Sequence, residues 1–273
     1  MIISQLHQQA VALDPQQHGK LKLQWPLTDW SVAARLNSIF VAVAEFTDVC
    51  KEYPIVFVRA GHEADGSEQI APVAVLGVVA DENLYLEGPA GQPQGWRAAY
   101  RPAVLQAYPF GIARIDDERV AVCLDAGWSG VGTEIGQPLF DSAGQPAELL
   151  SAMQQHLQLL EGQIQSTRLF GRRLQELELL REMRFEATLP DGRKHTVDGF
   201  LTVDADKAQN LSDAIVGDLH RTGMLGLIHL HWASLGLMRR LMDMHVQRLP
   251  ATAGAAVSVS VSAPAPAASA PAV

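Results

Sequence analysis

The stretch that decides the fold reads YPIVF (residues 53–57), VAVLGV (73–78), NLYL (83–86), WRAAYRPAVLQAYPF (96–110) and VAVCLD (120–125). Short apolar runs rich in β-branched and aromatic residues are typical of buried strands. Glycine and proline cluster between these runs and predict loops there. The stretch is therefore predicted to form a mixed or mainly antiparallel sheet that is interrupted by aromatic-proline steps.

The composition is that of an ordinary globular protein. The chain has 273 residues, of which 48% are hydrophobic and 19% are charged. Its net charge of −9 would repel the phosphate backbone that dominates nucleic-acid affinity, so no nucleic-acid partner is expected. The two cysteines, Cys50 and Cys123, are too few for a disulfide framework and too far apart for a metal knuckle. We expect two buried thiols.

Neither a secretory signal nor a membrane span is predicted. The first 22 residues lack a basic start followed by an apolar run. The most apolar stretch, residues 225–238, contains His229 and His231 and falls short of the roughly 20 residues that cross a bilayer. We expect a cytoplasmic protein, with the cell surface, reached by a signal-independent route, as the alternative.

The segment before the predicted sheet contains a short strand and a helix. Residues 20–23 alternate as a half-buried edge strand does. Residues 32–50 carry Val41, Ala44 and Glu45 at helical intervals, which predicts a buried or half-buried helix. That helix would hold Glu45 near apolar surface, where an ionised carboxylate needs a partner.

From residue 146 onward the apolar spacing changes to that of a long amphipathic helix. Steps of three and four residues relate Leu150, Met153, Leu157, Leu160, Ile164 and Thr167. Continued to Glu182, the helix would be about 55 Å long, and Gly162 and Gly171 are positions where it could bend. Its apolar seam from Leu150 to Leu174 could pack on the sheet or on a second copy of the chain, so a homo-oligomer is one of two alternatives.

The C-terminal part predicts a hairpin and then helices. An Asp-Gly turn at residues 191–192 joins predicted strands at 185–189 and 195–203, and Asp-Gly between alternating runs is a strong hairpin signal. Helices are predicted at 213–219 and 224–244. The second is apolar nearly all round, which indicates burial.

Together these patterns predict an α+β fold. One domain over residues 1–249 would hold the sheet, the long helix, the C-terminal β-hairpin and the buried helix pair, with 1–144 and 145–249 as an alternative division into sub-units. Residues 250–273 consist mainly of Ala, Pro, Ser and Val. Such a segment cannot bury enough surface to offset its chain entropy, so a disordered tail is expected.

The order of these motifs matches one known family. The YPIVF run is followed by Tyr108-Pro109-Phe110 and a Val-Cys-Leu-Asp strand, and Glu45-Phe46 precedes it. Near the C-terminus, Gly199-Phe200-Leu201 is followed by His231, Ser234 and Leu235. From about residue 15 to 245, the chain resembles the SapC family of bacterial proteins.

The resemblance indicates the biological setting of the protein and does not indicate a specific reaction. The family takes its name from a surface-layer-associated protein. Other members are typically found beside TonB-dependent receptors, cupin-type hydroxylases and flavin-dependent tryptophan halogenases. It implies no catalytic residues, and the expected lack of an export signal argues against a literal surface-layer role.

One functional hypothesis is an enzyme with a cleft built from Glu45, Arg101 and His231. A carboxylate near apolar surface could be a base with a raised pKa, and it could equally anchor Arg101 or strand-end amides. His231 could act with Ser234, or be a packed, hydrogen-bonded histidine. On a helix, His229 and His231 point about 200° apart, so no metal site is predicted, and the sequence carries no cofactor motif.

The preferred hypothesis is a non-catalytic binding or accessory protein. The aromatic-proline region supplies four candidate ligand-binding residues, Trp96, Tyr100, Tyr108 and Phe110. Aromatic side chains line peptide and ring-binding pockets because they give large contact areas at low entropic cost, although they also fill cores. The predicted partner is a peptide, an aromatic metabolite or a partner enzyme.

Overall fold

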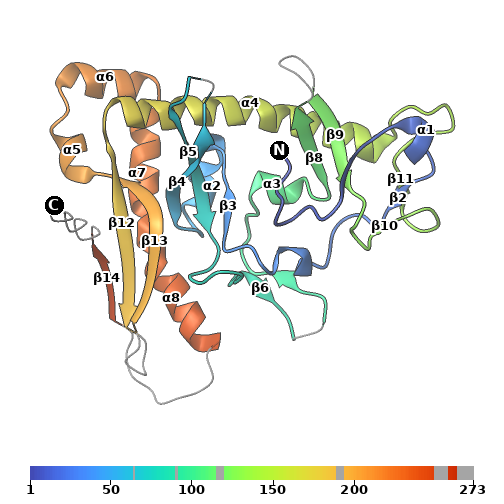
Figure 1. Ribbon diagram of the computed structural model, residues 1–273, viewed down its shortest axis with the longest axis horizontal. Helices are drawn as coiled ribbons and strands as arrows, with labels where there is room; N and C mark the ends of the chain where they lie inside the picture. The colour runs from blue at the N-terminus through green and yellow to red at the C-terminus, as the bar shows by residue number, and fades with distance from the viewer. Residues whose placement is uncertain (64, 90–91, 115–119, 189–193, 249–257, 263–273) are drawn as a thin grey trace, which may run out of the picture.

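Figure 1 shows the computed structural model of the chain, which describes residues 1–63, 65–89, 92–114, 120–188, 194–248 and 258–262. The strands are β1 (Ala10–Ala12), β2 (Lys22–Leu23), β3 (Ser38–Phe40), β4 (Ile55–His62), β5 (Glu68–Val75), β6 (Leu86–Glu87), β7 (Gly95–Trp96), β8 (Phe110–Arg114), β9 (Val120–Asp125), β10 (Val131–Gly132), β11 (Gln137–Pro138), β12 (Leu180–Thr188), β13 (Lys194–Val203) and β14 (Ser258–Ser262). The α-helices are α1 (Pro15–His18), α2 (Phe46–Val49), α3 (Ala103–Gln106), α4 (Glu148–Glu176), α5 (Ala205–Gln209), α6 (Asp213–Arg221), α7 (Met224–Leu235) and α8 (Leu237–Arg248), and the 3₁₀ helices are η1 (Ser31–Ala33) and η2 (Val43–Glu45). The predicted α+β class is confirmed.

The strands form several sheets rather than one. The largest has the order β14-β12-β13-β4-β5-β3, and its neighbouring strands run antiparallel. The strand at residues 120–125 is confirmed as β9, but it pairs with β1 and β8 in a separate sheet. Smaller sheets join β2 to β10 and β11, and β6 to β7. The predicted sheet is thus divided between two halves of the molecule.

The helix predicted at residues 32–50 is wrong. The segment instead contains η1, the edge strand β3, η2 and the single turn α2. Ser38, Ile39 and Phe40 pair with β5, and the Asn37 carbonyl accepts the Leu76 and Gly77 amides. The unpaired edge of β5 offers these residues hydrogen bonds that the local helical spacing cannot reveal.

The long helix α4 connects the two halves (Figure 1). Its first half packs Leu150 and Leu157 in the core around β8 and β9, and its second half packs Ile164 and Phe170 against the large sheet. The seam therefore faces the chain's own sheets, while oligomerisation remains a prediction. At 29 residues the helix is about 44 Å long. The helix ends at Glu176, before the predicted end at Glu182, because the chain enters β12 at Leu180.

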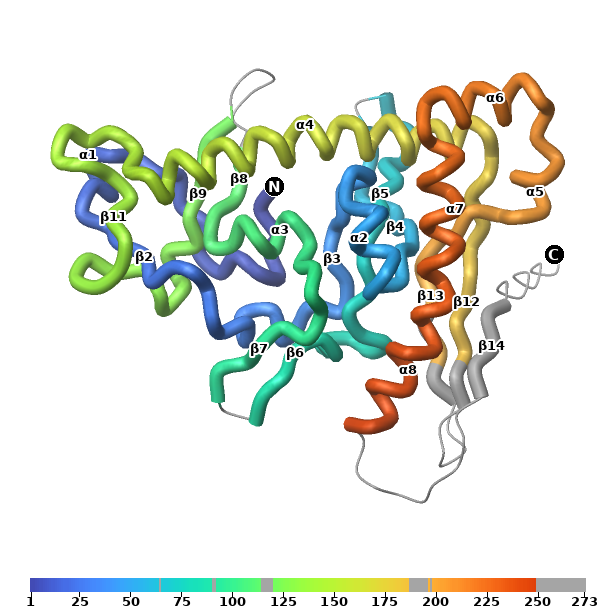
Figure 2. The backbone as a smooth tube through the Cα atoms, turned by 180° about the vertical axis from the view of Figure 1, so that it is seen from behind, coloured from blue at the N-terminus to red at the C-terminus, as the bar shows by residue number. Residues whose placement is uncertain are grey.

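The predicted hairpin is confirmed as β12 and β13, and its turn at residues 189–193 lies outside the described residues. The apolar stretch 224–244 forms two helices, α7 and α8, which meet at Gly236. In α7 only Ile228, His231 and Ser234 are buried, so the expectation of burial all round is wrong for this helix. Both views show α7 lying on the face of β4 and β13, which covers one side of the helix (Figures 1 and 2).

Five residues of the tail form a strand. Residues 258–262 form β14, which pairs with the outer edge of β12 from Arg184 to Thr188. Alternating Ser and Val suit an edge strand, a pattern that the Ala- and Pro-rich surroundings conceal. The remainder of residues 249–273 lies outside the described residues.

Alanine substitutions at the two glycines of α4 are expected to have opposite effects on stability. A Cβ added at Gly171 would lie 2.5 Å from the backbone oxygen of Ile70 in β5, whereas nothing lies within 4 Å of one at Gly162. Gly171→Ala should lower the free energy of unfolding by about 1–3 kcal/mol through overpacking. Gly162→Ala should leave it unchanged or raise it by up to about 1 kcal/mol.

Urea unfolding of both variants, monitored by circular dichroism, tests this pair. Equal effects of the two substitutions would contradict the close approach of α4 to β5.

Candidate functional site

Three concave regions adjoin the segment from Gln24 to Ser31, which follows β2. The largest, here called the polar basin, has a volume of about 1060 Å³ and includes Asp29 and Ser31. The second, the outer groove, has a volume of about 580 Å³ and lies between Trp25 and Trp128. The third, the tryptophan pocket, has a volume of about 230 Å³. It is lined by Trp25, Pro26, Leu27, Trp30, Arg101, Gln106, Met153 and His156.

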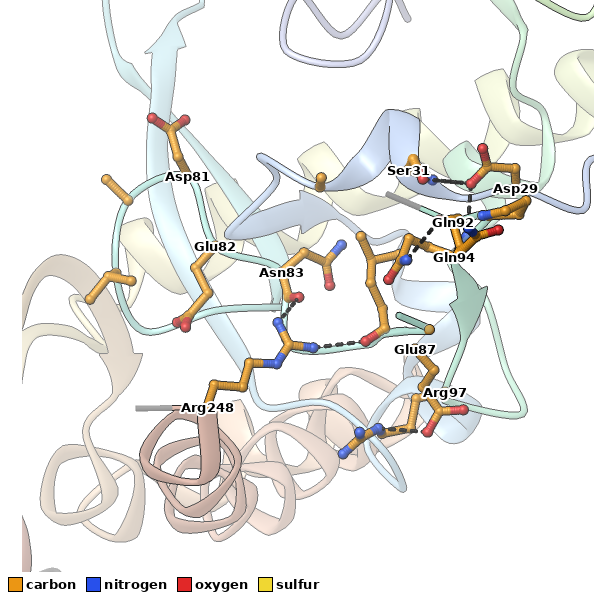
Figure 3. Close-up of a pocket in the computed structure, with 16 residues that line it drawn as sticks. Asp29, Ser31, Asp81, Glu82, Asn83, Glu87, Gln92, Gln94, Arg97 and Arg248 are labelled. Carbon is orange, nitrogen blue, oxygen red and sulfur yellow. Dashed lines mark hydrogen bonds and ion pairs between the residues drawn. The ribbon is translucent and has the colours of Figure 1, made fainter. Parts of the chain in front are cut away.

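The polar basin is held together by its own side chains, as Figure 3 shows. Arg248, at the end of α8, donates to the backbone oxygens of Asn83 and Leu86, both at 2.7 Å. Arg97 pairs with Glu87 at 2.9 Å. The carboxylate of Asp29 accepts hydrogen bonds from Ser31 and Gln94. The contacts of Arg248 thus hold the end of α8 on the segment that leads into β6.

The tryptophan pocket brings together three distant parts of the chain. Trp25 and Trp30 come from the segment after β2, Arg101 from the loop before α3, and Met153 and His156 from α4. The Arg101 guanidinium lies over the Trp30 ring, 5.2 Å from its centroid, which is a cation–π contact. The pocket therefore combines apolar walls with a few polar groups, as ligand sites commonly do.

Two carboxylates fix the loop that carries Arg101. Glu52 accepts the backbone amides of Ala99 and Tyr100, at 2.9 and 2.8 Å. Glu45 accepts the Ala103 amide at 2.6 Å and the Tyr100 hydroxyl at 2.8 Å. Arg101 is thus flanked by anchored residues, and Glu45 and Glu52 act as positioning residues for it.

Glu45 itself lies behind the pocket. Its side chain is buried, and it also accepts the Ala42 amide at 2.8 Å. Burial raises the pKa of Glu45, and the hydrogen bonds from Ala42, Ala103 and Tyr100 only partly oppose this. Glu45 thus accepts backbone amides, as one alternative expected, but these amides, of Ala42 and Ala103, lie at the starts of η2 and α3 and not in a strand.

His231 and Ser234 lie in another part of the molecule, where they hold β4. His231 donates from Nδ1 to the Ile55 carbonyl at 2.8 Å, and its Nε2 accepts the Val203 amide at 3.1 Å. The Ser234 hydroxyl accepts the Ile55 amide at 2.9 Å and donates to the His231 carbonyl. The pair thus bonds both backbone groups of Ile55. Of the predicted cleft residues, only Arg101 lines the tryptophan pocket.

The four predicted ligand-binding aromatics do not line this pocket. Trp96 packs edge-on against Trp30 and donates to the Tyr53 hydroxyl, so it forms the layer behind the pocket wall. Tyr100 is hydrogen-bonded to Glu45 as described. Tyr108 and Phe110 are buried in the core, each about 1% exposed.

Of the eight pocket residues, the sequence predicted only Arg101 as a site residue and missed Trp25, Pro26, Leu27, Trp30, Gln106, Met153 and His156. Trp25-Pro26 is an aromatic-proline step like those at 100–102 and 108–109, and this was the available signal. Asp125 was also missed. It is fully buried and accepts the amides of Gln8, Gln9 and Gly127. Burial alone would raise the pKa of Asp125, but these hydrogen bonds hold it below its usual value.

The model of the SapC family matches residues 13–241, which is most of the chain and includes all eight residues of the tryptophan pocket. The chain belongs to the SapC family. Comparison of this SapC chain with curated proteins and with solved structures found no match. Within the described residues, no helix combines the length and hydropathy needed to cross a membrane.

The environment of His231 predicts a pH-dependent stability. Burial lowers the pKa of His231 from 6.5 to about 4, and the bond to the Ile55 carbonyl only partly opposes this. Since the folded-state pKa lies below the unfolded value, the stabilisation is complete above pH about 6.5 and is lost as the pH falls through about 4. His231→Asn should lower the free energy of unfolding at pH 7 by about 2–4 kcal/mol. It should also flatten the pH dependence between those values.

The control is His229→Asn, because His229 is exposed two residues away and should change stability by no more than about 0.5 kcal/mol. Denaturant unfolding at several pH values measures both variants. An unchanged pH profile in His231→Asn would contradict this assignment.

Proposed function

We propose that this SapC protein is a non-catalytic binding or accessory protein whose tryptophan pocket accepts one aromatic ring or one apolar side chain. The observation that carries the proposal is the pocket itself, where Trp25, Leu27, Trp30 and Met153 surround a space of about 230 Å³. Drug-sized ligands occupy roughly 300–1,000 Å³, so the space suits a single ring better than a large cofactor.

The chemistry of the lining favours binding over catalysis. Its eight residues include no carboxylate, thiol or hydroxyl group to serve as a nucleophile, and its one imidazole, that of His156, has its Nε2 3.2 Å from the Ala103 carbonyl oxygen. Glu45 is committed to backbone amides, and both ring nitrogens of His231 are bonded to the backbone. These commitments support a positioning and packing role for the two residues in place of the alternative enzyme.

The outer groove gives the pocket a natural extension. The two share Trp25, Pro26 and Leu27 as a common wall, so a peptide with one side chain in the pocket has a neighbouring surface to lie on. The family resemblance to proteins found beside TonB-dependent receptors supports, as part of this proposal, an accessory role in uptake. The partner is thus a small aromatic metabolite or a peptide.

A pocket-filling substitution tests the proposal. Met153→Phe should narrow the space with a rigid ring and weaken the binding of neutral single-ring probes such as benzyl alcohol and 3-phenylpropanamide by at least about 10-fold. At about −0.3 kcal/mol per heavy atom, 3-phenylpropanamide binds with a Kd of about 4 mM and the smaller benzyl alcohol more weakly, so ligand-observed saturation-transfer NMR is the suitable measurement.

The matched control is Leu159→Phe on the same helix, where the side chain is 69% exposed. Its binding should equal that of the native chain. The proposal fails if no ring probe receives saturation at millimolar concentration, or if Met153→Phe binds as well as Leu159→Phe.

A further inference from the structure

The tryptophan pocket contains one permanently charged group, the guanidinium of Arg101. Among the described residues, no carboxylate forms an ion pair with it. On the basis of the proposed function, we infer that the pocket selects ligands in which an aromatic ring carries a carboxylate, with Arg101 as the partner of the carboxylate. Two sources share this chemistry, a free arylalkanoic acid and the C-terminal aromatic residue of a peptide.

Arg101 is the group that carries the inference. Among the described residues, no carboxylate oxygen lies within ion-pair distance of its guanidinium, whose contact is the Trp30 face. The nearby arginines differ, since Arg97 pairs with Glu87 and Arg248 donates to backbone oxygens. A guanidinium offers a planar pair of donors that matches a carboxylate, and these donors are available in Arg101.

The two carboxylates that bond the loop of Arg101 are committed to other partners. Glu45 accepts three hydrogen bonds and Glu52 accepts two, and these bonds hold the loop on both sides of Arg101. Gln106 donates its side-chain amide to the Arg101 carbonyl, which fixes the main chain of the same residue. The loop is therefore organised before any ligand arrives, and this lowers the entropic cost of binding.

The surroundings make this charge selective. Trp25, Leu27 and Met153 line one side of the pocket with apolar surface, and an ion pair is stronger next to such low-dielectric walls. The chain as a whole carries a net charge of −9, which opposes the approach of anions, so a carboxylate needs a local cation such as Arg101 in order to bind. His156 adds a ring on the same wall, oriented by its Nε2 at 3.2 Å from the Ala103 carbonyl. A ligand whose ring packs against the tryptophans and whose carboxylate pairs with Arg101 would use both the apolar and the charged parts of the pocket.

The experiment compares 3-phenylpropionate with its neutral isostere 3-phenylpropanamide by NMR titration of the full chain. The native chain should bind the acid at least 10-fold more tightly than the amide, with a difference that shrinks as salt is added. Arg101→Gln should remove the preference, because it should weaken the binding of the acid more than that of the amide. Arg97→Gln, four residues earlier and outside the pocket, should keep the preference.

A second variant, which keeps the positive charge, allows the inference to be tested even if the first one misfolds. Arg101→Lys keeps the charge but loses the planar donor pair, so it should retain a reduced preference of about 3-fold even if Arg101→Gln proves unstable in thermal denaturation. Titration with N-acetyl-Gly-Gly-Phe and with its C-terminal amide distinguishes a peptide C-terminus from a free acid as the source of the carboxylate. Tighter binding of this peptide acid than of 3-phenylpropionate assigns a peptide C-terminus, and weaker binding assigns a free acid.

The failures of the two proposals are distinct. Equal binding of acid and amide by the native chain, or an undiminished acid preference in Arg101→Gln, overturns the inference about Arg101 and leaves the ring-binding function standing. Binding of neither compound overturns the proposed function itself.

Discussion

Both backbone hydrogen-bonding groups of Ile55 are held by two side chains of one helix. His231 takes the carbonyl and Ser234 takes the amide, while the other ring nitrogen of His231 accepts the Val203 amide. In the described part of the chain, β4 and β13 share a single ladder position, Leu201 with Phe57. The buried backbone groups beside it need partners, and α7 supplies them. The neutral histidine thus completes the large sheet.

The second constraint is the helix α4, which contributes to both cores and so fixes their relative position. Its backbone approaches β5 closely at Gly171, and its earlier turns present Met153 and His156 toward the loop of Arg101. The loop is in turn held by Glu45 and Glu52. The tryptophan pocket therefore lies where the two halves of the molecule meet, and its shape depends on the packing of α4.

Much of the fold is predictable from local patterns. The strands at YPIVF and VAVCLD, the Asp-Gly hairpin and the long amphipathic helix are signalled by periodicity and turn chemistry, which act over neighbouring residues. The helix expected at residues 32–50 failed because the edge of β5 captures Ser38 to Phe40. Local spacing cannot show a competing hydrogen-bond partner that lies more than 30 residues away.

The sequence by itself determined the family and the α+β class, since these follow from motif order and from periodicity. Only the tertiary structure decided what surrounds Arg101. Trp30 and His156 are 126 residues apart in the chain and share one pocket wall. Their convergence results from packing between distant elements, as does the burial of Tyr108 and Phe110 in the core. Burial and proximity depend on how the whole chain packs, so the pattern of residues along the sequence does not predict them.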